Sequence, residues 1–231
     1  MLRRSLVLVA IVMGAALAAG EGVSKDQTSD LPDGLELYLE GRILESNGRY
    51  REAMEAYAAA LEEAPEVNEI RLAFATFLVD VGMAGRAVEV LDAASDPGPE
   101  GLRVRALALA QLSSRNSELL PKTEAALRLA IDSNEGDPNL LFSLAQILQR
   151  QGRFAEAEAI VADLREGRPG NTRLLVLHAD LLHAIGRSEE AVALYATCTD
   201  GGPFAPACRE KIVEVLIELG RPGEAGERML G

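Results

Sequence analysis

The chain has 231 residues, of which 48% are hydrophobic and only 4% aromatic, and it contains no tryptophan. Leu and Ala, which are strong helix formers, must supply much of the core, so the composition favours an all-helical fold over a β-sandwich and excludes a disordered chain. The formal net charge of −13 argues against nucleic acid and anionic lipid as partners, because both require a basic surface. The acidic residues are spread along the chain, which is typical of a well-solvated surface; a basic partner is the alternative.

Residues 1–20 have the pattern of a secretory signal peptide. Arg3 and Arg4 precede an apolar stretch of about fourteen residues, which ends in small residues around Ala18. A helix that spans a bilayer needs about twenty apolar residues, so we expect cleavage near Ala18 or Gly20. Retention as an inner-membrane anchor is the alternative. Residues 21–33 are polar and lack periodicity, which predicts a flexible leader.

An internal repeat begins near residue 34. Five segments share a Gly followed five residues later by an Ala, and they recur at steps of 34, 70, 34 and 34 residues, where 70 is two repeats with two inserted residues. The pairs are Gly48/Ala53, Gly82/Ala87, Gly152/Ala157, Gly186/Ala191 and Gly220/Ala225. A period of 34 residues is typical of a helix–turn–helix unit, in which Gly permits the turn and Ala allows two helices to approach closely.

Other positions recur in the same register. Small residues fall in the middle of the first helix of a unit, at Gly41, Ala75, Ala145 and Ala179. Large residues follow the Ala of the second helix by four positions, at Tyr57, Leu91, Val161, Tyr195 and Met229. Prolines are expected to end the units at Pro65, Pro99, Pro169 and Pro203. With these positions, the chain resembles the tetratricopeptide repeat (TPR) family from about Gly34 to its C-terminus.

The resemblance implies an all-α fold, a right-handed α–α superhelical solenoid of about five TPR units plus a partial sixth. The expected units are residues 34–67, 68–101, 102–137, 138–171, 172–205 and 206–231. The third unit departs from the pattern: its turn at residues 113–121 is longer, and its second helix is expected at residues 123–131. This turn is either a tolerated insertion or a binding element.

The last unit is short, and solenoids usually end in a polar capping helix. The apolar residues Ile212, Val215, Leu216 and Met229 are therefore expected either to pack adequately or to meet a partner or a second copy.

In this family the first helices line a concave groove, which implies a set of candidate partner-binding residues. They are Tyr38, Arg42, Asp80, Arg103, Asn139, Phe142, Gln146, Gln149, Arg150, Arg173, Asp180 and His183. Phe142, Gln146, Gln149 and Arg150 share one helical face and would suit an extended peptide or a helix. The alternative is that Phe142 makes a local apolar contact and the polar residues are only solvated. The Lys/Asn clamp with which some TPR domains hold a C-terminal carboxylate is absent, because its first-repeat positions carry Tyr38 and Arg42.

The two cysteines, Cys198 and Cys208, are ten residues apart, across the loop between two expected helices. In an exported protein an even number of cysteines favours a disulfide, and two buried thiols are the alternative. The only histidines, His178 and His183, are five apart on one helix and so point to different faces, which does not suit a zinc pair. No metal site, cofactor motif or catalytic motif is predicted.

These features predict a non-enzymatic interaction scaffold or adaptor. Its expected location is the bacterial cell envelope, with export to the periplasm, and its expected partner is another protein bound in the concave groove. The alternative is a structural protein that forms a homodimer through its incompletely capped C-terminal repeat. The sequence names neither the partner nor the pathway.

Overall fold

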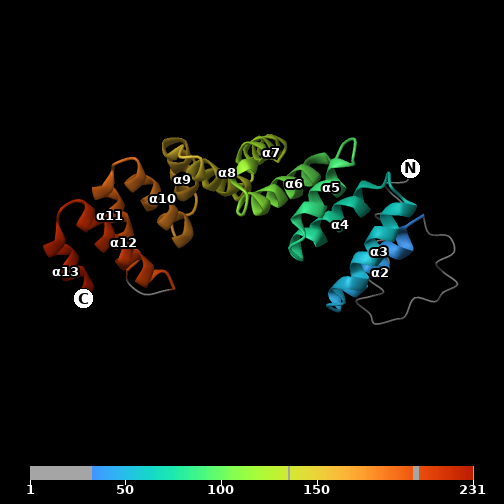
Figure 1. Cartoon of the computed structure of the whole chain (residues 1–231), viewed down its shortest axis with the longest axis horizontal. Coiled ribbons are helices and arrows are strands. Elements are labelled where there is room, and N and C mark those ends of the chain that lie inside the picture. Colours follow the sequence, from blue (N-terminus) through green and yellow to red (C-terminus); the bar gives the residue numbers. More distant parts are fainter. Residues whose placement is uncertain (1–32, 135, 200–202, 231) are drawn as a thin grey trace. The chain divides into compact units, whose positions relative to one another are not determined.

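The computed structural model describes residues 33–134, 136–199 and 203–230. Over these ranges the chain forms twelve α-helices and one short 3₁₀ helix and contains no strand (Figure 1). The predicted signal peptide and nearly all of the predicted leader lie outside the described residues. No described helix combines the length and the apolar character that crossing a membrane requires.

The chain divides into two compact units, the first ending at Phe74 and the second beginning at Ala75. The first unit holds α2 (Leu35–Ser46), α3 (Tyr50–Glu63) and the start of α4 (Asn68–Asp80). Its core joins Ala60, Ala64 and Ile70, and the ring of Tyr57 stacks on Phe74 with 6.0 Å between centroids.

The second unit holds the rest of α4 and all later helices. These are α5 (Ala84–Asp92), α6 (Gly98–Ser113), the 3₁₀ helix η2 (Ser117–Leu119), α7 (Leu120–Ser133), α8 (Pro138–Arg150), α9 (Phe154–Glu166), α10 (Thr172–Ala184), α11 (Ser188–Ala196), α12 (Ala205–Glu218) and α13 (Pro222–Leu230). The helices pack in pairs, α6 on α7, α8 on α9, α10 on α11 and α12 on α13, and the second helix of each pair also packs on the first helix of the next. This is the helix–turn–helix repeat that the 34-residue period predicts.

The turn between α8 and α9 shows why Gly recurs in the sequence. Gly152 has φ 77°, and an added Cβ would meet no atom within 4 Å, so only the backbone conformation requires glycine. The next amide, Arg153 N–H, donates to the carbonyl of Leu148 at 2.9 Å and so satisfies a carbonyl at the end of α8. The recurring glycine therefore reverses the chain while keeping the helix end hydrogen-bonded.

The recurring small and large residues occupy the core, as the repeat pattern predicts. The small residues Ala53, Ala75, Ala87, Ala145, Ala157, Ala179 and Ala191 are 0% exposed, and Tyr57, Leu91, Val161 and Tyr195 are at most 2% exposed. At Gly41 an added Cβ would lie 3.0 Å from the ring of Tyr57. The helices are therefore packed too closely at these positions for a larger side chain.

The third repeat differs from expectation in where its helices begin. Its second helix, α7, begins at Leu120 rather than at residue 123, and Pro121 lies in its first turn instead of in the preceding loop. Pro99 likewise lies in the first turn of α6 rather than ending the second repeat. Proline is tolerated there because the first amides of a helix have no intrahelical acceptor to lose. Thr123 is buried, and its hydroxyl donates to the carbonyl of Leu119 at 2.9 Å.

Arginines that follow the turn glycines link successive repeats. Arg153 donates two hydrogen bonds of 2.6 Å to Glu156 at the start of α9, and its remaining nitrogen donates to Glu124 of α7 at 2.7 Å. Partial burial opposes ionisation of Glu124, but hydrogen bonds from Arg153 and Arg128 outweigh it and hold the pKa of Glu124 below its ordinary value. The same arrangement recurs at Arg187 with Glu190 and Glu158, and at Arg221 with Glu224 and Glu189.

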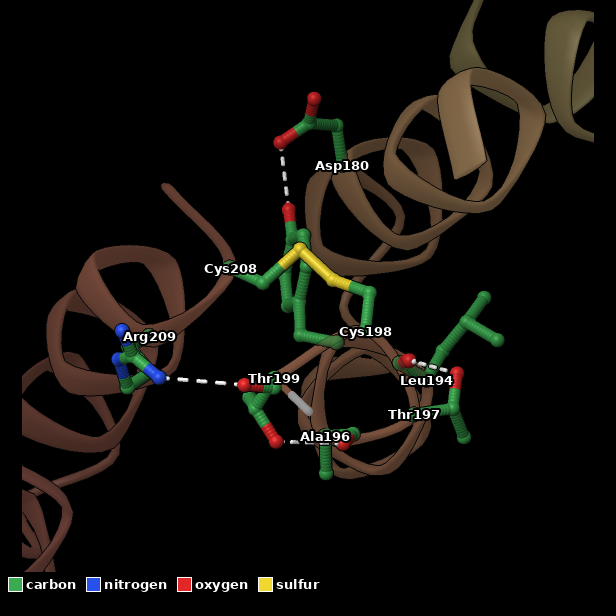
Figure 2. The surroundings of a disulfide bond; sticks show 9 residues. Asp180, Leu194, Ala196, Thr197, Cys198, Thr199, Cys208 and Arg209 are labelled. Carbon is green, nitrogen blue, oxygen red and sulfur yellow. Dashed lines mark hydrogen bonds between the residues drawn. A yellow bond between two sulfur atoms is a disulfide. The ribbon is translucent and has the colours of Figure 1, made fainter. Parts of the chain in front are cut away.

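A disulfide joins Cys198, just after α11, to Cys208 in α12, with the two Cα atoms 6.3 Å apart (Figure 2). Beside it, the guanidinium of Arg209 donates to the carbonyl of Thr199 at 3.1 Å. The bridge therefore connects the fifth repeat to the partial sixth.

The C-terminal repeat covers the apolar face of α12. Ile212, Val215 and Leu216 are 0–2% exposed and belong to one cluster with Tyr195 and both cysteines. Of the two outcomes expected for these three residues, adequate packing is the one found. The side chain of Met229 lies outside the part of the chain that the structure describes.

Candidate functional site

Some of the expected groove residues of the second unit line two separate hollows. The first, here called the amide hollow, lies between α6 and α8 and has a volume of about 270 Å³. It is lined by Ala110, Ser114, Ser143, Gln146, Ile147, Gln149 and Arg150. Three of the four residues expected to act together, Gln146, Gln149 and Arg150, thus line one hollow.

Arg150 is held by a hydrogen-bonded contact with the neighbouring repeat. Its guanidinium donates to the carbonyl of Ser113 at 2.6 Å and to the Ser113 hydroxyl at 3.4 Å. Ser113 is the last residue of α6, where carbonyls lack intrahelical donors, so Arg150 caps that helix from the next repeat. The guanidinium of Arg150 is therefore already hydrogen-bonded within the protein. Gln146 and Gln149 are the side chains of the hollow that are more available to bind a ligand.

The second hollow, here called the arginine notch, lies at the start of α8 and α10 and has a volume of about 90 Å³. It is lined by Pro138, Asn139, Phe142, Leu164, Arg168, Asn171, Arg173 and Leu174. The guanidinium carbon of Arg173 lies 5.2 Å from the centroid of the Phe142 ring, which is cation–π geometry.

Phe142 therefore lines a different hollow from Gln146, Gln149 and Arg150, although the helical spacing predicts one shared cluster. The spacing correctly places all four on one helix, but eight residues of helix separate Phe142 from Arg150 by about 12 Å along the axis. At the height of Phe142 the nearest partners come from α10 and the loop before it, whereas at the height of Arg150 they come from the end of α6. The tertiary structure decides which helix lies beside each position along α8, and the periodicity of the sequence does not predict it.

In the first unit, Tyr38 and Arg42 form a local pair rather than a ligand clamp. The guanidinium of Arg42 donates to the Tyr38 hydroxyl at 3.1 Å, and the rings of Tyr38 and Tyr57 lie 6.1 Å apart. The hydroxyl of Tyr57 in turn donates to Glu45. The polar side-chain groups of Tyr38, Arg42 and Tyr57 are thus hydrogen-bonded within the first unit.

The remaining candidates are mostly engaged inside the protein. Asp180 accepts a hydrogen bond from the buried Tyr195 hydroxyl, and His183 contacts Ser188 at 2.9 Å and Glu218 at 3.0 Å. Burial, followed by the contact with Asp180, raises the pKa of Tyr195 above its ordinary value. Elsewhere, Arg103 pairs with Glu100 at 2.8 Å, and Asp80 is exposed at the end of α4.

Comparison with known protein families decides what kind of repeat this is. Tetratricopeptide repeat models match residues 44–112 and residues 142–206. The chain belongs to the tetratricopeptide repeat family.

Solved TPR structures have the same fold. MamA superposes with a TM-score of 0.61 at 18% identity, covering 81% of this chain and 94% of MamA. YrrB, a TPR protein with an unusual peptide-binding site, gives 0.58 at 17% identity, covering 84% and 92%. A TPR protein from Parabacteroides merdae gives 0.59 at 21% identity, covering 84% and 75%. A search of curated proteins found no match.

TPR domains are generally non-enzymatic interaction scaffolds, and the fold points to protein–protein interaction.

His178, the one buried histidine of this TPR chain, is structural. Arg165 approaches its Nδ1 at 2.5 Å, and its Nε2 lies 3.0 Å from Glu158. The sequence did not reveal these two partners of His178 on α9. Among the described residues, no three His, Cys, Asp or Glu side chains are placed to hold a metal ion.

Proposed function

We propose that this protein is a scaffold that binds an extended segment of a partner protein across α6, α8 and α10. The observation that carries the proposal is the amide hollow, an open space of about 270 Å³ whose polar lining is mainly serine and glutamine. Side-chain amides both donate and accept, so Gln146 and Gln149 can satisfy the backbone of a segment that has no other hydrogen-bonding partner. Ala110 on the facing helix leaves room for it.

The chemistry of the hollow supports binding rather than catalysis. Its hydroxyl and amide groups do not titrate near neutral pH, and its one charged residue, Arg150, already donates to Ser113. YrrB, which has a similar fold, has a peptide-binding site. A peptide ligand is therefore consistent with the architecture.

We place the protein outside the cytoplasm, in the periplasm, with an inner-membrane anchor as the alternative. The charged, apolar and small-residue pattern of residues 1–20 supports export. The bridge between Cys198 and Cys208 supports an oxidising compartment, because disulfides are rare in reducing cytoplasm.

Site-specific photocrosslinking tests the binding surface. A photoreactive phenylalanine analogue replaces Gln146 in the hollow or, as the control, Leu129, which is 50% exposed on the second helix α7. Crosslinking is carried out in the organism's envelope fraction. We expect a discrete adduct from position 146 and none from position 129. Adducts from position 129 alone, or none from either position, would refute the proposal.

Self-association is a second candidate, favoured by two apolar residues at the end of α12. Ile217 is 57% exposed and Leu219 is 38% exposed. If they form a dimer interface, light scattering should show a mass that doubles with concentration, and Ile217→Asp should abolish the increase. A chain that stays monomeric at high concentration removes this candidate.

A further inference from the structure

The arginine notch is a basic site on an acidic protein. Its lining includes Arg168, from the turn before α10, and Arg173, from the first turn of α10, but no acidic residue. Among the residues that the structure describes, neither guanidinium forms an ion pair. Asp137, which immediately precedes the notch residue Pro138, is not part of the lining, and its Oδ1 accepts the Asn139 amide at 2.8 Å and caps α8.

Several other arginines of this chain are held in ion pairs. Arg153 and Arg221, which follow turn glycines, each bind two carboxylates, and Arg103 binds Glu100. The chain carries 36 acidic and 23 basic residues, so carboxylates for pairing are abundant. What sets Arg168 and Arg173 apart is that two arginines outside the internal ion-pair network line the same small hollow.

The notch is also preorganised to donate hydrogen bonds. The Phe142 ring supports the guanidinium of Arg173 from one face, which restricts the long side chain while its N–H edges stay accessible. The side-chain oxygen of Asn171 accepts the amides of Arg173 and Leu174 at 3.1 and 3.3 Å, so its NH₂ group is what remains for a ligand. The polar side-chain groups that remain for a ligand are therefore mainly donors, which suits an anion.

We propose that the arginine notch binds the carboxylate of an Asp or Glu side chain in the partner segment that occupies the amide hollow. A planar carboxylate matches the fork of an arginine, and a volume of about 90 Å³ admits the end of a side chain but not a second helix. This inference rests on the proposed function and specifies its ligand: an acidic, extended segment.

The geometry of α8 also sets a spacing. Phe142 and Gln149 are seven residues apart, which is about 10 Å along a helix. An extended chain advances about 3.3 Å per residue, and the two hollows also lie toward different neighbouring helices, so the acidic residue should lie at least about three residues from the residue that enters the amide hollow.

Selection from a peptide library tests the carboxylate ligand and the spacing. The full chain is immobilised and offered random decapeptides, together with matched peptides that carry Asp, Asn, phosphoserine or Lys at the selected acidic position. The variants are Arg168→Glu/Arg173→Glu in the notch, Gln146→Lys/Gln149→Lys in the hollow, and Arg51→Glu as an exposed control on α3. Circular dichroism confirms that each variant is folded.

We expect the wild type and the Arg51→Glu control to prefer the Asp peptide over the Asn peptide by about tenfold, the sum of two exposed ion pairs. The notch variant should lose this preference and favour Lys. Peptides selected without an acidic preference, and lost only in the hollow variant, would overturn the notch while leaving the proposed function intact. A preference for phosphoserine over Asp would overturn the carboxylate assignment. If no peptide is enriched, both proposals fail.

Discussion

Reduction of the disulfide should destabilise one end of the solenoid without affecting the rest. Cys198 and Cys208 are ten residues apart, and closing a loop of that size restricts the unfolded chain by about 2.7 kcal/mol in the chain-entropy treatment. Repeats contact only their neighbours, so the loss should be confined to the last repeats. A change of about 2.7 kcal/mol corresponds to about a hundredfold faster exchange of amides that open by local unfolding.

Native-state hydrogen exchange measures this directly. Amides of α12 and α13 should exchange about a hundredfold faster after reduction, while those of α8 and α9 should be unchanged. Reduced wild type keeps both sulfurs in the core, so it isolates the covalent link from side-chain packing. The Cys198→Ala/Cys208→Ala variant, which should not respond to reductant, controls for other effects of the reagent. Equal loss of protection in all helices, or no loss in α12, would refute this reasoning.

Three further predictions concern packing, hydrogen bonding and pH. Ala157→Leu should lower the free energy of urea unfolding by about 1–3 kcal/mol, because Ala157 is 0% exposed between packed helices, whereas Leu at the exposed Ala155 should have little effect. Tyr195→Phe should cost about 1 kcal/mol by removing the donor to Asp180, and an unchanged urea midpoint would contradict this. Hydrogen bonds from Arg153 lower the pKa of Glu156 in the folded protein. The contribution of Glu156 to stability is therefore present above the unfolded carboxyl pKa of about 4.3, and it is lost as the pH falls through the lower folded pKa. Glu156→Gln should therefore flatten the acid limb of a plot of stability against pH.

Most of the fold could be predicted from sequence because its determinants are local and periodic. The offset from each turn glycine to the alanine and then to the large residue is short, so positions such as Ala157 and Val161 can be assigned to the core without knowing their partners. The start of the second helix in the third repeat was harder to predict, because Pro121 suits either a loop or the first turn of a helix. Packing of the whole of α7 decides between the two.

The candidate site was only partly predictable, since it depends on contacts between repeats. Sequence placed Phe142 and Arg150 on one helix, but only the tertiary structure decides that Phe142 meets Arg173 while Arg150 caps α6. The sequence did not predict that Arg168 belongs to the site, because an arginine in a turn is ordinarily a solvated charge. The sequence by itself determined the repeat, its core and its turns, since these depend on side chains a few residues apart. The tertiary structure decided which charges are paired and which remain free, because a long side chain takes its partners from whatever the next repeat places within its reach.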